Sequence, residues 1–275
     1  MNFTQQFSLE VTRPNADEIA ALGQILPAAT PVYFSAVPTI QPHELVADAA
    51  LLRKAGLEPV VHIAARRLAS AELLQDLLKR LTGEADVRRL LVIGGDVDAT
   101  GPFADALAVI QKGRLREVGI EEIGIGAYPE GHPKISPQRL EASLDEKIAS
   151  ATAQGLRVHI ISQFSFSAEN IIAWLKKLRA GGIAHPVKVG LAGPTSVTAL
   201  LRFAKRCGVA TSLRGLMSGA ATSLIGNVGP DRILEEFSAA NGALGDIHPH
   251  YYSFGGVVAT ARYAAEKAQA GAPAL

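Results

Sequence analysis

Short apolar runs alternate with longer amphipathic stretches along the chain. The apolar runs have the length and composition of β-strands and lie at Phe7–Val11, Val32–Val37, Pro59–Ile63, Arg89–Ile93, Glu122–Ala127, Val158–Phe164, Val187–Leu191 and Ile247–Phe254. In the longer stretches apolar residues recur every three or four positions, which predicts helices at Ala16–Leu26, Glu44–Ala55, Ala71–Leu81, Phe103–Lys112, Pro137–Ala153, Ala168–Arg179, Ser196–Lys205 and Val257–Ala268. A strand followed by a helix, repeated about eight times, is the pattern of a parallel barrel or a doubly wound sheet.

Three features favour the barrel. The strands are apolar on both faces, as in residues 90–93, and a parallel sheet covered by helices requires this. The 275 residues suit a barrel of about 250 residues. No Pro/Ser-rich linker interrupts the chain. We therefore predict an α/β fold, a (β/α)8 TIM barrel, as a single domain over residues 1–275 with a frayed tail at 269–275. A doubly wound sheet is the alternative.

The stretch from Gly208 to Gly245 is too long for one crossover between strands. It contains two helical patterns, at Leu213–Leu224 and Asp231–Ala240, which predict extra helices before the last strand. Ser167 and Thr195 each precede a predicted helix and are of a type that caps helix N-termini.

Composition narrows the class of protein. Apolar residues make up 48% of the chain, and 27 basic against 26 acidic residues leave a formal charge of +1, so no nucleic-acid or anionic membrane partner is indicated. A single cysteine, Cys207, leaves no internal disulfide and no Cys-rich zinc site. No secretory signal and no apolar run of about 18 residues is found. We expect a cytoplasmic protein, and the apolar content is compatible with a homo-oligomer.

Chemistry in such barrels lies at the C-terminal ends of the strands. Polar residues occupy or follow the ends of the predicted strands, namely Glu10, Ser35, His62, Asp96, Tyr128, His132, Gln163, His250 and Tyr252. Two acids, an amide, imidazoles and phenols suit the binding of a polar heterocycle better than a nucleophile triad. The chain has no Gly-x-Ser-x-Gly elbow, no Walker loop and no Gly-x-Gly-x-x-Gly fingerprint.

Glu10 lies between two apolar residues, where an unpaired carboxylate would be costly. Burial favours its protonated form, which suits a general acid, whereas an ion pair with Arg13 would make it structural. Asp96 follows two glycines and is either a turn cap or a catalytic group. Arg66 and Arg67 are either a solvated pair or a phosphate clamp.

Some of these histidines have simpler roles. His62 alone on an apolar strand is typical of a hydrogen-bonded core residue. His248 and His250 flank a proline without a carboxylate cluster, so we predict no metal site.

Several of these segments resemble motifs of the methylenetetrahydrofolate reductases. Residues 127–133, Ala-Tyr-Pro-Glu-Gly-His-Pro, match that family's Tyr-Pro-Glu-x-His-Pro loop almost letter for letter. Residues 7–14 resemble its opening Ser-Phe-Glu-Phe-Phe-Pro-Pro, and residues 161–166 resemble its Ile-Thr-Gln-Phe-Phe-Phe strand. Residues 94–96, Gly-Gly-Asp, stand where the family has Arg-Gly-Asp, and residues 250–253 resemble its closing His-Phe-Tyr-Thr. Order and spacing agree over essentially the whole chain.

The resemblance implies an eight-stranded barrel that binds FAD along its strand ends. It also implies reduction of 5,10-methylenetetrahydrofolate to 5-methyltetrahydrofolate with NAD(P)H, a step of one-carbon metabolism that supplies methionine biosynthesis. By position, the implied catalytic residues are Glu10 as general acid and Asp96, which would contact the pterin. Gln163 and Tyr252 would also bind the folate. The positions that would touch FAD are Ser35, His62, Gly95, Tyr128 and His132.

The sequence departs from the family where the flavin phosphates are expected. Gly94 replaces an arginine, and Leu144 and Ala151 align with an acid and a lysine of the family, with Lys134, Lys147, Arg66 and Arg67 as compensating cations. Two such losses predict weakened FAD binding. The alternatives are direct hydride transfer from nicotinamide to the same folate without flavin, or a non-redox folate-binding barrel that acts as a regulator or a methyltransferase.

Overall fold

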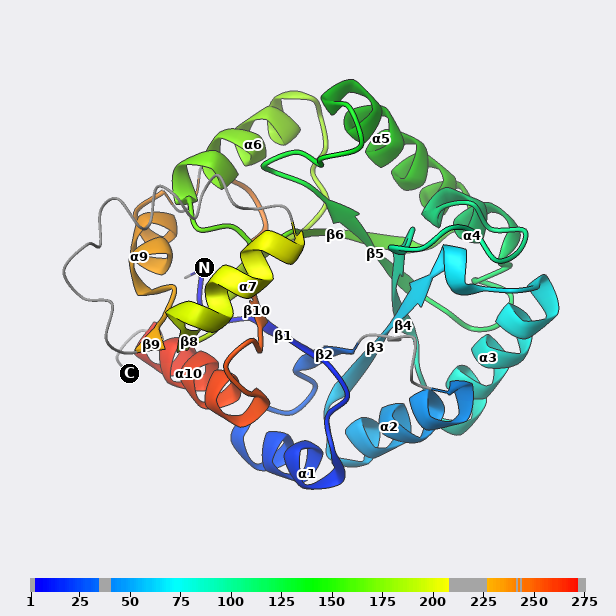
Figure 1. Cartoon of the computed structure of the whole chain (residues 1–275), viewed down its shortest axis with the longest axis horizontal. Helices are drawn as coiled ribbons and strands as arrows, with labels where there is room; N and C mark the ends of the chain where they lie inside the picture. Colours follow the sequence, from blue (N-terminus) through cyan, green and yellow to red (C-terminus); the bar gives the residue numbers. More distant parts are fainter. Residues whose placement is uncertain (1–2, 35–40, 208–226, 241, 243, 272–275) are drawn as a thin grey trace. The chain divides into compact units, whose positions relative to one another are not determined.

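A closed barrel of parallel strands forms the centre of the fold. The computed structural model describes residues 3–34, 41–207, 227–240, 242 and 244–271. The barrel strands among these residues are β1 (Ser8–Val11), β2 (Pro31–Phe34), β3 (Glu58–Ala64), β4 (Arg89–Ile93), β5 (Glu122–Ala127), β6 (Arg157–Ser162), β7 (Val187–Ala192) and β10 (Ile247–Tyr252). Their order around the barrel is β1-β10-β7-β6-β5-β4-β3-β2 (Figure 1). The (β/α)8 barrel is confirmed, and the doubly wound sheet is wrong. Each predicted strand overlaps an observed one, but β6 and β10 end two residues earlier than predicted, and residues 35–37 of the predicted second strand lie outside the described residues.

Helices surround these strands. Their bounds are α1 (Ala16–Ile25), α2 (Pro42–Lys54), α3 (Ala71–Glu84), α4 (Ala106–Lys112), α5 (Pro137–Ala153), α6 (Ala168–Ala180), α7 (Val197–Cys207), α9 (Asp231–Ala239) and α10 (Val257–Ala270), with a short 3-10 turn η1 at Ala65–Arg67. α4 begins three residues later than predicted, because Asp105 is extended and accepts a hydrogen bond from the Ala108 amide as the N-cap. The predicted extra helix at Asp231–Ala240 is confirmed, whereas Leu213–Leu224 lies outside the described residues.

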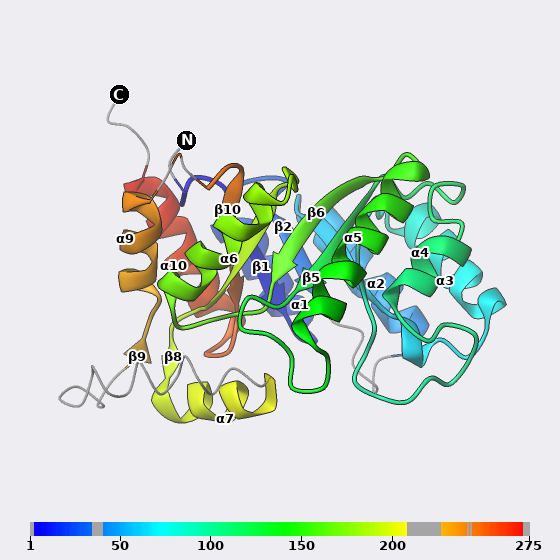
Figure 2. The same cartoon turned by 90° about the horizontal axis from the view of Figure 1, so that it is seen from above.

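One of the two predicted caps is confirmed. Ser167 Oγ accepts a hydrogen bond from the Asn170 amide at 3.2 Å and caps α6. Thr195 does not cap α7. It lies in a short strand, β8 (Thr195–Ser196), which pairs antiparallel with β9 (Asn227–Val228), and Ser196 Oγ accepts from the Ala199 amide at 3.3 Å. α7 follows directly from this small sheet (Figure 2). A two-residue strand leaves no periodic signal, so the sequence did not predict it.

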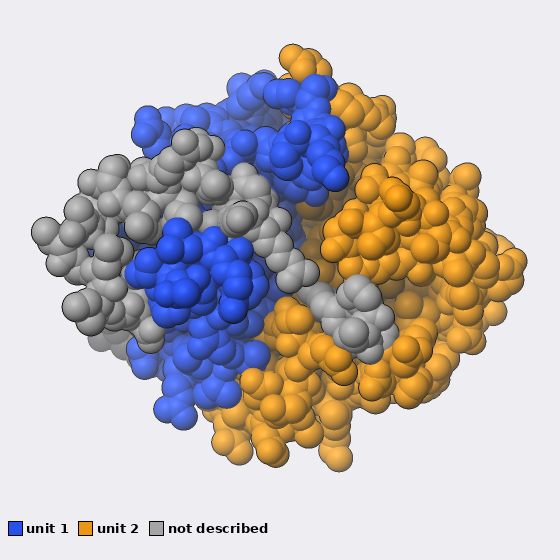
Figure 3. Space-filling view, viewed as in Figure 1, with its two compact units in different colours: residues 1–10, 127–137, 161–275 blue, residues 11–126, 138–160 orange. Residues whose placement is uncertain are grey.

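The chain divides into two compact units (Figure 3). Unit 1 comprises Met1–Glu10, Ala127–Pro137 and Ile161–Leu275, and unit 2 comprises Val11–Gly126 and Gln138–Ile160. The expectation of one domain over the whole chain stays a prediction. Among the residues that the structure describes, no helix is long and apolar enough to cross a membrane.

In unit 1 the register of two neighbouring strands brings polar residues together. Strand β1 pairs with β10 so that Ser8 is opposite His250 and Glu10 is opposite Tyr252. Since alternate residues of a strand share a face, these four side chains point to the same side of the sheet. The pairing therefore joins residues that are more than 240 positions apart in the sequence.

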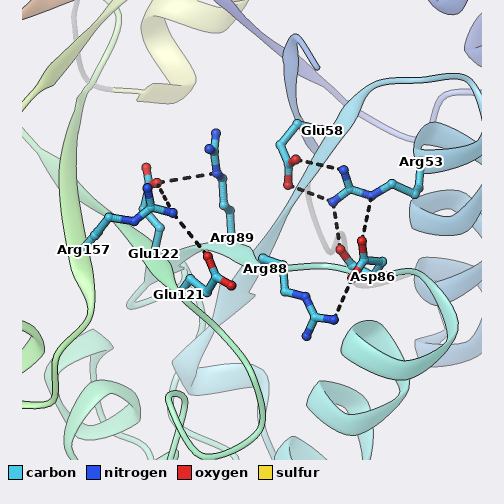
Figure 4. Close-up of polar contacts among 8 residues, drawn as sticks. All are labelled: Arg53, Glu58, Asp86, Arg88, Arg89, Glu121, Glu122 and Arg157. Carbon is cyan, nitrogen blue, oxygen red and sulfur yellow. Dashed lines mark hydrogen bonds and ion pairs between the residues drawn. The ribbon is translucent and has the colours of Figure 1, made fainter. Parts of the chain in front are cut away.

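In unit 2 the strand beginnings carry an ion-pair network (Figure 4). Arg53 forms a two-pronged contact with Glu58 at 2.8 and 2.9 Å, and Arg88 reaches Asp86 at 2.7 Å. A second group joins Arg89 and Arg157 to Glu122, each at 3.5 Å. These charges lie at the N-terminal ends of β3 to β6, the end of a barrel that serves stability rather than chemistry.

Glu122 also begins a buried chain of hydrogen bonds. Its Oε1 lies 2.7 Å from Nδ1 of His159, and Nε2 of the same ring lies 2.7 Å from the Tyr33 hydroxyl. Tyr33 is on β2 and His159 on β6, strands that are separated in the barrel by β3, β4 and β5. The contact therefore crosses the barrel interior, and polar groups that are paired in this way stiffen a core.

Candidate active site at the strand ends

Glu10 lies at the centre of a buried hydrogen-bond chain in unit 1. Its Oε2 is 3.2 Å from Nε2 of His250, and Nδ1 of that imidazole is 2.8 Å from Ser8 Oγ. The His250 and Ser8 side chains are fully buried, whereas the Glu10 side chain is 13% exposed. The chain thus runs from the barrel interior to a carboxyl that a ligand can reach, and its groups can hold and pass a proton.

The backbone around Glu10 is fixed as well. The amide and the hydroxyl of Ser253 donate to the Glu10 carbonyl at 3.1 and 2.7 Å. The Glu10 carboxyl therefore pairs with His250, and the ion pair with Arg13 stays a prediction. A carboxyl that is held at both its backbone and its side chain is pre-oriented for a reacting group.

Tyr252 lies next to this chain. Its ring meets the His250 ring edge-on, with centroids 5.0 Å apart, and its hydroxyl donates to the Ser162 carbonyl at 3.4 Å. The same ring stacks on Phe254 and tilts against Phe164. These rings form a continuous aromatic wall beside Glu10, the kind of surface on which a heterocycle packs.

Gln163 follows the last residue of β6 and belongs to the same unit. Its backbone N–H donates to the Ala127 carbonyl at 2.8 Å, and its backbone carbonyl accepts from Ser162 Oγ at 3.0 Å. Its side-chain oxygen is buried. Glu10, Gln163 and Tyr252 are thus three of the predicted residues that unit 1 positions at its strand ends.

Asp96 belongs to unit 2 and is held by an arginine. Arg67 Nη2 lies 2.5 Å from Asp96 Oδ1, while the Asp96 carboxylate is 67% exposed. Gly95 precedes it with a φ of +93°, a conformation that favours glycine. Arg66 donates to the carbonyls of Ala104 and Gly95, at 2.9 and 3.3 Å. The two arginines therefore fix the loop after β4, and a role for them as a phosphate clamp stays a prediction.

The loop between β5 and α5 is closely hydrogen-bonded. The Gly131 amide donates to the Tyr128 carbonyl at 3.0 Å, and the rings of Tyr128 and His132 meet edge-on at 5.2 Å. His132 Nδ1 accepts a hydrogen bond from the Lys134 amide at 3.2 Å. The motif that carried the family resemblance therefore presents an aromatic pair in a defined conformation.

Two more predicted residues have different outcomes. His62 is buried in unit 2, and its ring meets that of Tyr33 edge-on at 6.4 Å. Ser35 lies outside the described residues.

His248 pairs with an acid near the start of β10. Its Nε2 is 2.8 Å from Asp246 Oδ1, and burial lowers the pKa of this histidine. Within the described part of the chain, no group of three or more His, Cys, Asp and Glu side chains could hold a metal ion.

Helix α5 contains the two positions, 144 and 151, where the sequence lacks the charged residues expected near the flavin phosphates. Leu144 and Ala151 are buried, so both positions face the core of unit 2. Lys147 lies between them, and burial lowers the pKa of its ammonium group while the charge of Asp105 raises it. A half-buried lysine near the carboxylates of Asp105 and Glu146 is a cation that this helix can offer to an anionic ligand.

The predicted residues have partners that their sequence context did not reveal. Ser8 was not singled out, although Ser8 and Glu10 stand two apart in a strand and so share a face. Arg67 was not connected with Asp96, because the two come from different strand ends and 29 residues separate them.

The fold and these strand-end groups define a class, the (β/α)8 barrels with polar chemistry at the C-terminal ends of their strands. The 3-dehydroquinate dehydratase of Aquifex aeolicus VF5 has a similar fold, with a TM-score of 0.53 over 98% of this chain and all of that one, at 8% identity. At this identity the likeness shows the fold alone.

Sequence comparison is more specific. Residues 13–213 match the model of the family "Methylenetetrahydrofolate reductase". The chain is 27% identical over 152 residues to the 5,10-methylenetetrahydrofolate reductase of Pectobacterium carotovorum, covering 55% of this chain and 49% of that protein. It is 29% identical to methylenetetrahydrofolate reductase 1 of Schizosaccharomyces pombe, covering 51% and 24%. The match thus spans half or less of these relatives. The chain belongs to the methylenetetrahydrofolate reductase family.

Proposed function

We propose that this protein is an oxidoreductase that interconverts 5,10-methylenetetrahydrofolate and 5-methyltetrahydrofolate, with NAD(P)H as co-substrate and FAD as the carrier of electrons. The observation that supports it most is the chain from Ser8 through His250 to Glu10, in a member of this family. It provides a proton donor at a strand end, where a barrel performs its chemistry.

The proton step follows from Glu10. In its protonated form Glu10 donates to one of the two nitrogens that share the methylene bridge. The bond from that nitrogen to the bridge carbon breaks, and the other nitrogen becomes an iminium ion. His250 then stabilises the carboxylate that remains on Glu10, because Nε2 faces it at 3.2 Å. Reduction of the iminium carbon gives the methyl group.

The other folate contacts are assigned by residue type and place. We assign Asp96, which is paired with Arg67, to the pterin, where a carboxylate balances the developing cation. The Gln163 amide suits the hydrogen-bonding edge of a pterin, and the Tyr252 ring adds a flat apolar surface.

The residues present fit a flavin nucleotide. We assign Tyr128, His132, Gly95 and His62 to it, and we add Lys147 as a cation for its phosphates. When bound, FAD supplies the transfer of two electrons from NAD(P)H to the folate carbon. Leu144 and Ala151 are buried and carry no charge, so Lys147 is the better assignment on this helix.

Direct hydride transfer from nicotinamide to the folate, without flavin, is the second candidate. Gly94 favours it, since this position offers no side chain to a phosphate. Both candidates use the same proton donor, and they differ in whether turnover requires FAD.

Glu10→Gln tests the proposal. We expect methylenetetrahydrofolate-dependent oxidation of NADH or NADPH, assayed with and without added FAD, to fall at least about 100-fold, the usual contribution of a general acid. Glu235→Gln on the exposed side of α9 is the matched control and should keep the wild-type rate. A Glu10→Gln variant with an unchanged melting temperature and an unchanged rate would remove Glu10 from the mechanism.

A further inference from the structure

The Tyr-Pro-Glu-Gly-His-Pro loop holds a second acid that the proton step does not use. Glu130 is the third residue of a turn that the hydrogen bond from the Gly131 amide to the Tyr128 carbonyl closes at 3.0 Å. Pro129 takes the second position, which suits its fixed φ, and Gly131 has a φ of +83°. A bridge between His132 and Ile135 continues the hydrogen-bonded loop. Glu130 therefore has a defined place.

The Glu130 carboxylate is buried and has no hydrogen-bond partner within the described part of the chain. Both Oε1 and Oε2 are shielded from water, and neither has a hydrogen-bond partner among the described residues. A glutamate in a turn can normally extend into solvent, and glutamates are almost never buried unless they are paired. An unpaired buried carboxylate is costly, so such a group calls for a donor that comes from elsewhere.

The surroundings indicate what kind of donor this is. Two acceptor oxygens on one planar group match two neighbouring hydroxyls, which is how carboxylates recognise ribose in nucleotide sites. The Tyr128 and His132 rings, on either side in the sequence, provide aromatic surface of the kind that packs on a heterocycle. A carboxylate and an aromatic pair on one loop together suit a nucleotide.

We infer that Glu130 is a binding residue for the sugar hydroxyls of a nucleotide cofactor. This rests on the proposed function, which offers two sources of such hydroxyls, the flavin nucleotide and the nicotinamide nucleotide. Glu130 is not a catalytic residue in this assignment. It holds the ligand, and the bound ligand in turn satisfies its carboxylate.

If Glu130 binds a nucleotide, Glu130→Gln should raise the melting temperature of the ligand-free protein and also weaken nucleotide binding. A purely structural role of Glu130 would not give both effects. In Glu130→Gln the ligand-free protein should melt about 2 °C or more above wild type, because an unpaired buried charge has been removed. The same variant should bind one of the nucleotides about tenfold or more weakly, since hydrogen bonds to a charged group are lost. Melting is followed by circular dichroism, and FAD, NADH and NADPH are titrated separately by calorimetry.

The matched control is Glu235→Gln, which should leave melting and binding unchanged. Glu130→Ala is a second variant, which should share the binding loss even if its smaller side chain changes the melting temperature. A Glu130→Gln variant that melts lower than wild type would show that the carboxylate has a structural partner and would overturn the inference. Unchanged affinity for all three nucleotides, or no nucleotide binding by wild type, would overturn it as well.

Folate turnover separates this inference from the proposed function. Wild-type protein that binds a nucleotide through Glu130 but does not turn over methylenetetrahydrofolate would refute the proposed reaction and leave this assignment standing. Normal turnover together with unaffected nucleotide binding in Glu130→Gln would refute this assignment alone.

Discussion

At the scale of single residues, Ser8 influences the hydrogen-bonding role of the His250 ring. A neutral imidazole has a proton on only one of its two nitrogens. A hydroxyl at Nδ1 therefore influences whether Nε2 donates a hydrogen bond to Glu10 or accepts one from it. Ser8 Oγ is 2.8 Å from Nδ1 and fully buried, so water does not readily replace it. Ser8 is therefore a positioning residue that acts on Glu10 through His250.

Ser8→Ala should lower kcat about fivefold and leave the KM for folate nearly unchanged. The loss corresponds to one buried hydrogen bond of about 1 kcal/mol that matters in the proton step and not in substrate binding. Steady-state kinetics over a range of folate concentrations measure both constants.

Ser238→Ala is the control for this change. The Ser238 hydroxyl donates to the Leu234 carbonyl within α9, away from the proposed site, so its loss should alter neither constant. A rise in KM with an unchanged kcat in Ser8→Ala would mean that Ser8 supports binding instead.

At the scale of an element, β5 depends on a glycine. A Cβ on Gly124 would lie 2.7 Å from His159 Nε2, closer than real Cβ contacts. The missing side chain makes room for the imidazole that joins Tyr33 to Glu122. Glycine at position 124 of β5 thus leaves the space that the hydrogen bonds of His159 with Tyr33 and Glu122 require.

Gly124→Ala should destabilise the protein by about 1–3 kcal/mol, the usual cost of overpacking a core. Gly126→Ala, two residues along the same strand, is a close control, since its Cβ would meet Ile93 Cγ2 at an ordinary 3.9 Å. Urea unfolding of both variants gives the difference. Equal midpoints would mean that His159 moves aside without loss.

The strands and most helices could be predicted because a repeating pattern of apolar residues is a local property of the sequence. Glu10 could be proposed because an acid between two apolar residues is unusual. Arg67 as the partner of Asp96, and Gly124 as the space for His159, could not be predicted, since these contacts join distant segments and follow from strand order. The buried state of Glu130 has no sequence signal either, because glutamate in a turn is ordinarily exposed.

At the scale of the whole molecule, acid stability should depend on Glu122. Burial alone raises the pKa of Glu122, but the hydrogen bond from His159 and the charges of His159, Arg89 and Arg157 outweigh it and lower the pKa from 4.5 to about 2. A pKa that is lowered in the folded state stabilises the protein above pH 4.5. This contribution is lost as the pH falls from 4.5 towards 2.

The slope of unfolding free energy against pH between about 4.5 and 2 should therefore be smaller in Glu122→Gln than in wild type. The variant is also expected to be less stable at pH 7, where it lacks the anionic partner of His159. Denaturant unfolding at a series of pH values measures both effects, with Glu235→Gln as the variant that keeps the wild-type slope. Identical slopes in Glu122→Gln and wild type would contradict the assignment.

The pairing of β1 with β10 has a consequence during synthesis of the protein. Ser8 and Glu10 are added to the growing chain some 240 residues before His250. Contacts so distant in sequence form late, after nearer segments have folded. Until His250 has been added, the proposed acid Glu10 therefore lacks its imidazole partner. In that interval the nascent chain can form its helices without catalytic activity. The proposed activity would begin when the last strand of the barrel takes its place beside the first.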